Sequence, residues 1–495
     1  MPRATAQPPS CARPAAWLRS SAATCTWPPS ATSRRPWCAS ARPPWSSRSC
    51  LKPPRNRGPP PGVTRPAADF AFSAAAGRRV SLHRGLQELQ HPRFAAGVGF
   101  QAFGRLAHGG ASFAILVVLA RVLDPAGVGL YASAVAFFGL LDALVDGGSV
   151  LALVRRSSAR PELLRPLLRR ARRLRTVTAS AAVAGALAYL LLDPRVPGAN
   201  AWGWIAALTM LSHVPGTDGA VFNLRLDFAL PALVRSATAL LSLGAALVLA
   251  LAHVTDPVAY LCVTQARTAV ANGILWACAR RHLRRFPDAG ADTRGYIRES
   301  LTLGAGGLLR EGYVRADVLF LRWLVGPDAA GLYAPARTAL NFALQWPSYL
   351  LTVALPPLAA EAHRDPAEFR RRALRLARGL AMFAVPAALL SFPLAPWFLQ
   401  VFFGAEYRAA TGALRMLAVA AALAYPGTAF LTALIASGGA RPALWISALA
   451  LAASATLSAV LVPPATLTGA AAARTAAEVV TLVLPALVLL RERHR

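Results

Sequence analysis

Long apolar segments, separated by short polar or basic connections, follow one another along the chain from Phe94 to its end. Each segment has about 18 to 30 residues, and an α-helix of ~20 residues crosses a hydrocarbon core of ~30 Å. The pattern therefore predicts an all-α membrane protein with about twelve transmembrane helices. Their predicted ranges are 95–121, 126–153, 176–193, 201–221, 228–253, 258–278, 300–324, 329–359, 379–402, 409–435, 442–462 and 465–490.

Residues that end one helix and begin the next occupy the predicted breaks. Proline lacks the N–H group that a helix interior needs, but it is favoured in the first turn of a helix. Glycine and aspartate are common in the turn just before it. Such turns are found at Asp124-Pro125, Thr255-Asp256-Pro257, Gly326-Pro327-Asp328, Gly438-Gly439 and Pro463-Pro464.

The composition excludes a soluble protein of this length. Hydrophobic residues make up 55% of the chain and charged residues 15%, and the mean hydropathy is +0.43. A soluble domain has roughly 25% charged residues. Six cysteines, four of them in the first fifty residues and none in a CxxC pair, exclude a disulfide scaffold and give no zinc motif.

The net charge of +31 is concentrated in a few connections between the apolar segments. Residues 154–175 contain nine arginines, and residues 279–299 and 360–378 contain six each, whereas the alternate connections contain almost none. Cytoplasmic loops of membrane proteins are rich in Arg and Lys, so we expect these segments and both termini to be cytoplasmic. Because the arginines are interspersed with apolar runs, the charge does not indicate nucleic-acid binding.

The chain divides into a tail and two predicted bundles. Residues 1–93 are rich in Pro, Ser and Arg and lack an apolar run, residues 94–285 hold the first six predicted helices, and residues 286–495 hold the last six. Three interpretations of the tail remain open: a mis-annotated start (at least for residues 1–79), a disordered basic tail held near anionic lipid, and a transit peptide.

A short internal repeat relates the two predicted bundles. The segment Leu123–Ala132 follows the first predicted helix, and Val325–Ala334 follows the seventh. The two copies share five of ten residues at an offset of 202, which are Pro125/Pro327, Gly129/Gly331, Leu130/Leu332, Tyr131/Tyr333 and Ala132/Ala334. Repeats of six helices keep the same orientation in the membrane, as in carriers whose halves move around a central site. We expect Pro125, Gly129, Tyr131, Pro327, Gly331 and Tyr333 to form equivalent structural turns.

Ionisable residues within the apolar segments indicate a cavity, because charges at bilayer depth are costly unless they face water or a partner. Arginine binds phosphate through two parallel hydrogen bonds. We therefore predict a cavity for an anionic substrate lined by Arg105, Arg267, Arg310, Arg315 and Arg337. Carboxylates expected to couple an ion or to neutralise these arginines are Asp142, Asp146, Glu311 and Asp317.

Spacing suggests specific partners for some of these charges. Glu311 and Arg315, like Arg474 and Glu478, are four residues apart and so adjacent on a helix. Arg310 and Asp317 share a helix face, so the four charges of this helix could equally neutralise one another. A further three arginines near helix ends are expected to extend to the membrane surface, and these are Arg235, Arg322 and Arg415.

Several motifs resemble those of the polysaccharide-export and O-antigen flippase families. They are Leu119–Tyr131, its second copy Arg315–Ala336, Phe403–Ala418, and Leu224–Phe228 before the fifth helix. This resemblance implies the fold of the multidrug/oligosaccharidyl-lipid/polysaccharide exporter superfamily, with two six-helix bundles around a central cavity. It also implies an oligosaccharide linked to polyprenyl diphosphate as cargo. Flippases of the superfamily that carry the peptidoglycan precursor have more than twelve helices, which argues against that substrate.

The expected function is alternating-access translocation of a lipid-linked oligosaccharide across the bacterial cytoplasmic membrane, for synthesis of cell-surface polysaccharide such as lipopolysaccharide. An ion-coupled exporter of small molecules or drugs from the same superfamily is the alternative, with Asp142 and Asp146 as its best support. A scaffold protein also remains open. Short outer connections argue against an enzyme. Expected partners are the lipid-linked glycan, membrane lipids and polysaccharide polymerase or assembly proteins; no cofactor, metal or nucleic acid is expected.

Overall fold

The computed structural model describes residues 92–192, 199–225, 227–284, 286, 293–345, 347, 351, 358, 361–362 and 364–491. Within these residues the chain is helical and contains no strand. This agrees with the all-α prediction. The predicted tail 1–93 lies outside the described residues except for its last two.

Thirteen α-helices are defined among the described residues. They are α2 (Pro92–Val122), α3 (Pro125–Asp146), α4 (Ser149–Ala159), α5 (Leu164–Leu192), α6 (Ala199–Gly216), α7 (Ala220–Leu224), α8 (Ala229–Leu251), α9 (Pro257–Leu283), α10 (Tyr296–Leu324), α11 (Pro327–Ala343), α13 (Pro366–Phe402), α14 (Thr411–Ala436) and α15 (Ala440–Arg491). Short 3-10 helices span Pro161–Leu163, Thr217–Gly219 and Ala405–Ala410.

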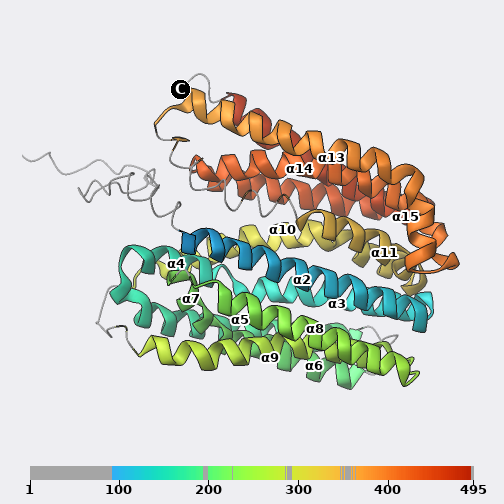
Figure 1. Ribbon diagram of the computed structural model, residues 1–495, viewed down its shortest axis with the longest axis horizontal. Coiled ribbons are helices and arrows are strands. Elements are labelled where there is room, and N and C mark those ends of the chain that lie inside the picture. Colours follow the sequence, from blue (N-terminus) through green and yellow to red (C-terminus); the bar gives the residue numbers. More distant parts are fainter. Residues whose placement is uncertain are drawn as a thin grey trace, which may run out of the picture. The chain divides into compact units, whose positions relative to one another are not determined.

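The helices form two bundles that meet along α2, α3, α10 and α11 (Figure 1). We name α2 to α9 the N-terminal bundle and α10 to α15 the C-terminal bundle. In the N-terminal bundle α2 packs on α8 and α6 packs on α5 and α9; in the C-terminal bundle α14 packs between α13 and α15. Helix α3 contacts both α10 and α11, so it carries much of the contact between the bundles.

Side-chain caps explain why helices begin at the predicted breaks. Asp124 precedes α3 and its carboxylate accepts a hydrogen bond from the backbone N–H of Gly127 at 2.8 Å, and Asp256 caps α9 in the same way. Each cap is followed by proline at the first helical position, which lacks the N–H that would otherwise need a partner. In α15 the predicted break at Pro463-Pro464 is a kink three residues later, at Thr466, whose φ is 46°.

Six described stretches are long and apolar enough to cross a membrane. They are Phe103–Val122, Pro125–Ser158, Ala229–Leu251, Pro366–Phe402, Ala405–Ala436 and Ala440–Arg491. Other helices, such as α10, carry several charges. Helix covers eight of the twelve predicted ranges completely. The range 126–153 is interrupted by a turn at 147–148, 228–253 extends slightly beyond α8, and 176–193 and 329–359 run into undescribed residues, so the count of twelve stays a prediction.

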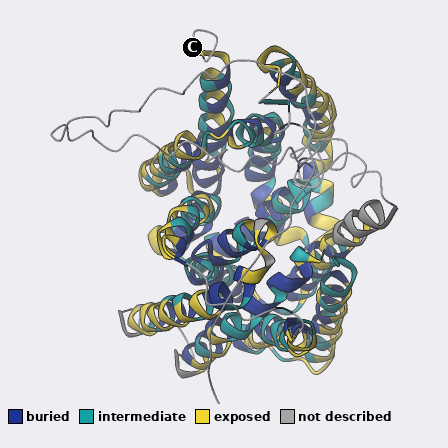
Figure 2. Cartoon of the chain, turned by 90° about the vertical axis from the view of Figure 1, so that its left-hand side faces the viewer, coloured by how far each residue is buried: buried dark blue, intermediate teal, exposed yellow. Residues whose placement is uncertain are grey.

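Figure 2 shows exposed residues on the outer faces of the helices and buried residues where helices face one another. Many of the exposed residues are large and apolar. Trp204, Leu251 and Met382 each expose more than three quarters of their surface. A water-soluble protein rarely exposes so many large apolar groups, whereas lipid accommodates them.

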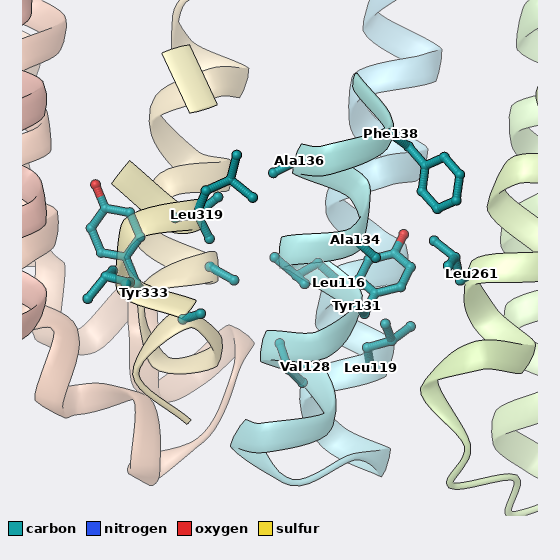
Figure 3. Close-up of a cluster of buried hydrophobic side chains, with 14 of the residues drawn as sticks. Leu116, Leu119, Val128, Tyr131, Ala134, Ala136, Phe138, Leu261, Leu319 and Tyr333 are labelled. Atoms are coloured by element: carbon teal, nitrogen blue, oxygen red, sulfur yellow. The ribbon is translucent and has the colours of Figure 1, made fainter. Parts of the chain in front are cut away.

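The two copies of the repeat pack directly on each other. A methyl group added at Gly129 would overlap the backbone carbonyl of Pro327, and one added at Gly331 would overlap the carbonyl of Pro125. The contact is therefore reciprocal, as a two-fold relation between the repeats requires. Tyr131 points toward Leu261 of α9, and Tyr333 lies on the other side of α3, near Leu319 of α10 (Figure 3). Tyr131 thus packs within the N-terminal bundle, and the equivalent Tyr333 packs within the C-terminal bundle.

Candidate functional site

The two bundles are in close contact at the end where α3 and α11 begin, which we name the turn end. Besides the glycine contact, Arg121 at the end of α2 donates hydrogen bonds to the backbone carbonyls of Val401 and Phe402 at the end of α13. Phe113 of α2 contacts aromatic rings of the other bundle at centroid distances of 5.6 to 6.4 Å, those of Phe342, Phe398, Phe402 and Phe403. These contacts close the space between the bundles at the turn end.

At the opposite end, which we name the basic end because it carries the Arg-rich segments, α4 and α10 pack tightly against each other. Gly148 and Gly304 bring the start of α4 against α10, with no room for a side chain between them. Arg156 of α4 binds Glu299 of α10 at 2.7 Å. On the other side of the interface, Phe103 and Arg105 of α2 are exposed. This part of α2 is therefore exposed at the surface of the described structure.

Two predicted charges in the C-terminal bundle form a closed, buried pair. Asp317 is 1% exposed, accepts hydrogen bonds from Tyr333 at 2.9 Å and from Nε of Arg337 at 3.2 Å, and also binds its neighbour's backbone N–H. Arg310 and Asp317 therefore do not pair with each other, although they share a face of α10. Because the charge of Arg337 is already balanced, this arginine has little capacity left for a ligand.

A second buried pair in the same bundle joins Arg474 and Glu478, at 2.6 Å. Arg474 also donates to the backbone carbonyl of Tyr313 at 3.3 Å, and Thr481 donates to Glu478 at 3.0 Å. The predicted pairing of these two residues is confirmed. Both pairs hold α10 against α11 and α15, which is a structural role.

A third charge cluster, which we name the interface cluster, spans the interface between the bundles. Its members are Asp142, His213, Arg310, Glu311 and Arg315. The guanidinium group of Arg315 lies against Gly139 of α3 and binds Glu311 at 3.0 Å, so the predicted pair of these two residues is also confirmed. Asp142, one turn beyond Gly139, faces Arg315 and Glu311 and lies 3.5 Å from His213. The side chain of Arg310 is about half exposed (49%) and lies 3.7 Å from Glu311.

The remaining predicted arginines form a cationic cluster in the N-terminal bundle. Arg105 on α2 faces Arg235 on α8, and His108 on α2 lies beside Arg235 and Arg267 of α9. Arg267 donates to the Ser112 hydroxyl at 3.4 Å, and its Nε is buried without a hydrogen-bond partner. Among the described residues, no carboxylate pairs with Arg235 or Arg267. We name Arg105, His108, Arg235 and Arg267 the N-bundle cluster.

The N-bundle cluster lies beside the exposed part of α2. Arg105, Gly109 and Phe113 are spaced by four residues and so lie along one side of α2. Gly109 meets the side chain of Gln345, which follows α11, and Phe113 meets the aromatic rings of the C-terminal bundle. Arg105 is the member of this row nearest the basic end, and it is exposed.

The structure thus divides the predicted site residues into separate groups. Arg105 and Arg267 come together, Arg310 and Arg315 lie in the interface cluster, and Arg337 lies in a buried pair. Asp146 binds Arg175, an arginine predicted to lie in a cytoplasmic loop but only 5% exposed. The prediction that Arg322 extends to the membrane surface is wrong, because its side chain is buried (7% exposed).

Sequence reasoning missed Arg235, Gly139 and the partners of two carboxylates. Arg235 lies six residues into α8 and was expected at the membrane surface; only the arrangement of α2, α8 and α9 brings it to the N-bundle cluster. Asp146 and Asp218 bind Arg175 and Arg172 from another helix, a pairing that no spacing along one helix indicates. No three His, Cys, Asp or Glu side chains form a metal-binding group in the described part of the chain.

Solved structures with a similar fold are transporters of the MOP superfamily. A multidrug resistance MATE family transporter in an inward-facing conformation matches with a TM-score of 0.59 at 15% identity, covering 80% of this chain and 96% of that one. A MOP superfamily transporter from Pyrococcus furiosus, described as having a binding pocket of reverse polarity, has a TM-score of 0.62 at 12% identity, covering 83% of this chain and 99% of that one. At such low identity these matches establish the fold alone.

The family is established by the sequence itself. No curated protein sequence matches the chain. The sequence model of a family described as "Polysaccharide biosynthesis protein", however, matches residues 118–411, more than half of the chain. The matched range includes both copies of the repeat and the first half of the segment that begins at Phe403. The chain therefore belongs to the polysaccharide biosynthesis protein family and has the fold of the MOP superfamily.

Proposed function

We propose that the protein moves an oligosaccharide linked to polyprenyl diphosphate across the cytoplasmic membrane by alternating access. The observation that carries this proposal is the N-bundle cluster, in which His108 lies beside Arg235 and Arg267, and no carboxylate of the described residues pairs with either of these two arginines. Positive charges at the depth of the bilayer are costly unless water or a negative ligand reaches them. A diphosphate offers several oxygens, each able to accept hydrogen bonds from a guanidinium group.

The position of the cluster suits a lipid-linked cargo. It lies beside the accessible side of α2 at the basic end, and the contacts at the turn end close the opposite exit. With the basic end in the cytoplasm, as the arginine distribution predicts, the diphosphate would enter from the cytoplasmic face. The polyprenyl tail would stay in the bilayer, where the exposed apolar faces of the helices allow it to slide. Polymerase or assembly proteins would receive the glycan on the far side.

Substitution of Arg267 tests the proposal. Arg267→Ala removes a guanidinium from the centre of the cluster, and we expect export of the lipid-linked glycan to fall about ten-fold or more, since a hydrogen bond to a charged group contributes roughly 1.5–3 kcal/mol. The measurement is accumulation of the lipid-linked glycan on the inner face of the membrane. Arg378→Ala, at an exposed site on α13, is the matched control. Normal export by Arg267→Ala at equal protein levels would contradict the proposal.

An ion-coupled exporter of small molecules is the second candidate, and the interface cluster favours it. Asp142, with a side chain 41% exposed, lies 3.5 Å from His213 and faces Glu311 of the other bundle. Carboxylates and a histidine shared between moving halves could exchange a proton during transport. Ion-driven efflux of small cations that is lost in Asp142→Asn and retained in Arg267→Ala would favour this function over glycan translocation.

A further inference from the structure

A second site lies outside the space between the bundles. A groove of about 750 Å³ opens at the basic end, where α10 begins, between α5 of the N-terminal bundle and α15 of the C-terminal bundle. Its lining includes Arg170 of α5, Ile297, Arg298, Leu301 and Ala305 of α10, and Leu444 of α15. The groove is thus formed by both bundles.

The groove is cationic at one end and apolar along its length. Arg170 is held in place by a hydrogen bond to the backbone carbonyl of Thr293 at 3.0 Å, and Arg298 lies across from it on α10. Ile297 and Leu301 form the apolar wall and are 45% and 50% exposed. Glu299, the neighbour of Arg298 on α10, binds Arg156 at 2.7 Å and Arg155 at 3.6 Å and does not line the groove.

We propose that this groove binds an anionic phospholipid of the leaflet at the basic end. The two guanidinium groups would bind the headgroup phosphate, and an acyl chain would lie along Ile297, Leu301 and Leu444. A free phosphate ion would use only the cationic part of the groove, leaving the apolar wall without a partner. Basic side chains at a membrane surface attract anionic lipid headgroups.

The groove is separate from the N-bundle cluster. Gly148 and Gly304 close the interface between α4 and α10, and Arg156 and Glu299 bind across it, whereas the cluster is reached from the side of α2. The occupant is therefore a resident membrane lipid and not the transported cargo. Because Arg170 belongs to one bundle and Arg298 and Leu444 to the other, the bound lipid stabilises the arrangement in which the bundles meet at this point.

Lipid retention by the purified, full-length protein tests this site. The protein is delipidated in detergent and incubated with dioleoyl phosphatidylglycerol or dioleoyl phosphatidylcholine, and bound lipid is counted by native mass spectrometry. We expect the wild type to retain one phosphatidylglycerol. Arg170→Glu combined with Arg298→Glu should lower its occupancy at least about ten-fold. Arg378→Glu, an exposed arginine on α13, should retain it.

A second variant distinguishes loss of lipid binding from misfolding. Ala305→Trp fills the apolar part of the groove without changing charge, and it should also lose the phosphatidylglycerol while its unfolding temperature stays near that of the wild type. Equal retention by the wild type and both groove variants would overturn the proposal. Equal retention of phosphatidylcholine, or complete displacement by inorganic phosphate or by a polyprenyl diphosphate, would do the same. None of these results depends on transport.

Discussion

The environments of Arg267 and Arg337 show how two arginines of similar depth acquire different roles. Arg337 binds Asp317 at 3.2 Å and the carbonyl of Val314 at 3.2 Å, so its charge and donors are largely satisfied. Arg267 has a hydroxyl at 3.4 Å and an Nε without a partner. Removing one member of a buried pair costs about 3–5 kcal/mol. Loss of Arg337 should therefore destabilise the protein, whereas loss of Arg267 should mainly affect a ligand.

Gly139 controls the position of Arg315 at the interface. The methyl group of Gly139→Ala would occupy the place of the Arg315 guanidinium, which lies at the end of a flexible side chain and can rotate away. We expect stability to change little, because alanine in a helix gains about 0.5–1 kcal/mol over glycine. Transport should fall, since Arg315 would no longer lie beside Asp142. Thermal unfolding and export measure the two effects.

The matched control for this substitution is Gly307→Ala in α10, where an added methyl group meets nothing within 4 Å. This variant should keep both its stability and its transport. Unchanged transport in Gly139→Ala would show that the placement of Arg315 against α3 has no functional role.

At the residue scale, local pairs were predictable and distant ones were not. Glu311 with Arg315 and Arg474 with Glu478 follow from the four-residue spacing of a helix, and both pairs are present. Asp317 with Arg337 and Asp146 with Arg175 join different helices. Their pairing depends on which helices are neighbours, and helix packing is set by the whole apolar surface of the bundle.

At the scale of the elements, helix starts were predictable because a few residue types determine them. Aspartate caps the first N–H groups and proline tolerates the first turn, so α3 and α9 begin where the sequence indicates. The turn residues at Pro463-Pro464 predicted a break between two helices, and α15 does consist of two helical segments that meet at a kink at Thr466. Proline disrupts a helix, whereas the packing of the flanking segments decides whether the result is a kink or a loop.

The glycine contact between the two repeats should be sensitive to a single methyl group. Gly129→Ala or Gly331→Ala places a methyl group against a backbone carbonyl that cannot rotate away, so α3 and α11 must separate at the turn end. Overpacking of this kind costs roughly 1–3 kcal/mol. We expect a lower unfolding temperature for each variant and the same effect at both sites. An effect at one site alone would contradict an equivalent role for the two repeats.

The cap of α13 should give this helix a measurable pH dependence. Backbone hydrogen bonds from Glu368 and Ala367 lower the pKa of Asp365, which lies just before the helix. A carboxyl group with a lowered pKa stabilises the folded helix start above its unfolded pKa of 3.8, and this stability is lost as the pH falls through the lower, folded value.

Hydrogen exchange of the first turn of α13 measures this dependence. Protection of the amides of Ala367 and Glu368 should be high near neutral pH and should decrease below the unfolded pKa as Asp365 takes up a proton. Asp365→Asn keeps a capping side chain that does not titrate, so its protection should not vary over the same range. The same decrease in Asp365→Asn would assign the effect to another group.

At the scale of the whole molecule, the fold class followed from segment length and composition, while the positions of the charged helices did not. α10 carries too many charges to be recognised as a membrane span from its apolar residues alone. It nevertheless packs against helices of both bundles and holds Arg315, Asp317 and Arg322 in three different environments. Its charges are tolerated because neighbouring helices provide partners. Those partners come from segments distant in sequence, which the single sequence does not identify.

Orientation in the membrane gives a direct test of the whole arrangement. The arginine distribution places the basic end in the cytoplasm, so a cysteine at Ser158, exposed near the end of α4, should be protected from an impermeant maleimide in intact cells. A cysteine at Thr255, exposed between α8 and α9 at the turn end, should react. Both are introduced into a cysteine-free background, because Cys262 is exposed. Permeabilised cells should label at both positions. Labelling of Ser158→Cys alone in intact cells would reverse the orientation, and the N-bundle cluster would then face the wrong side of the membrane to receive a cytoplasmic diphosphate.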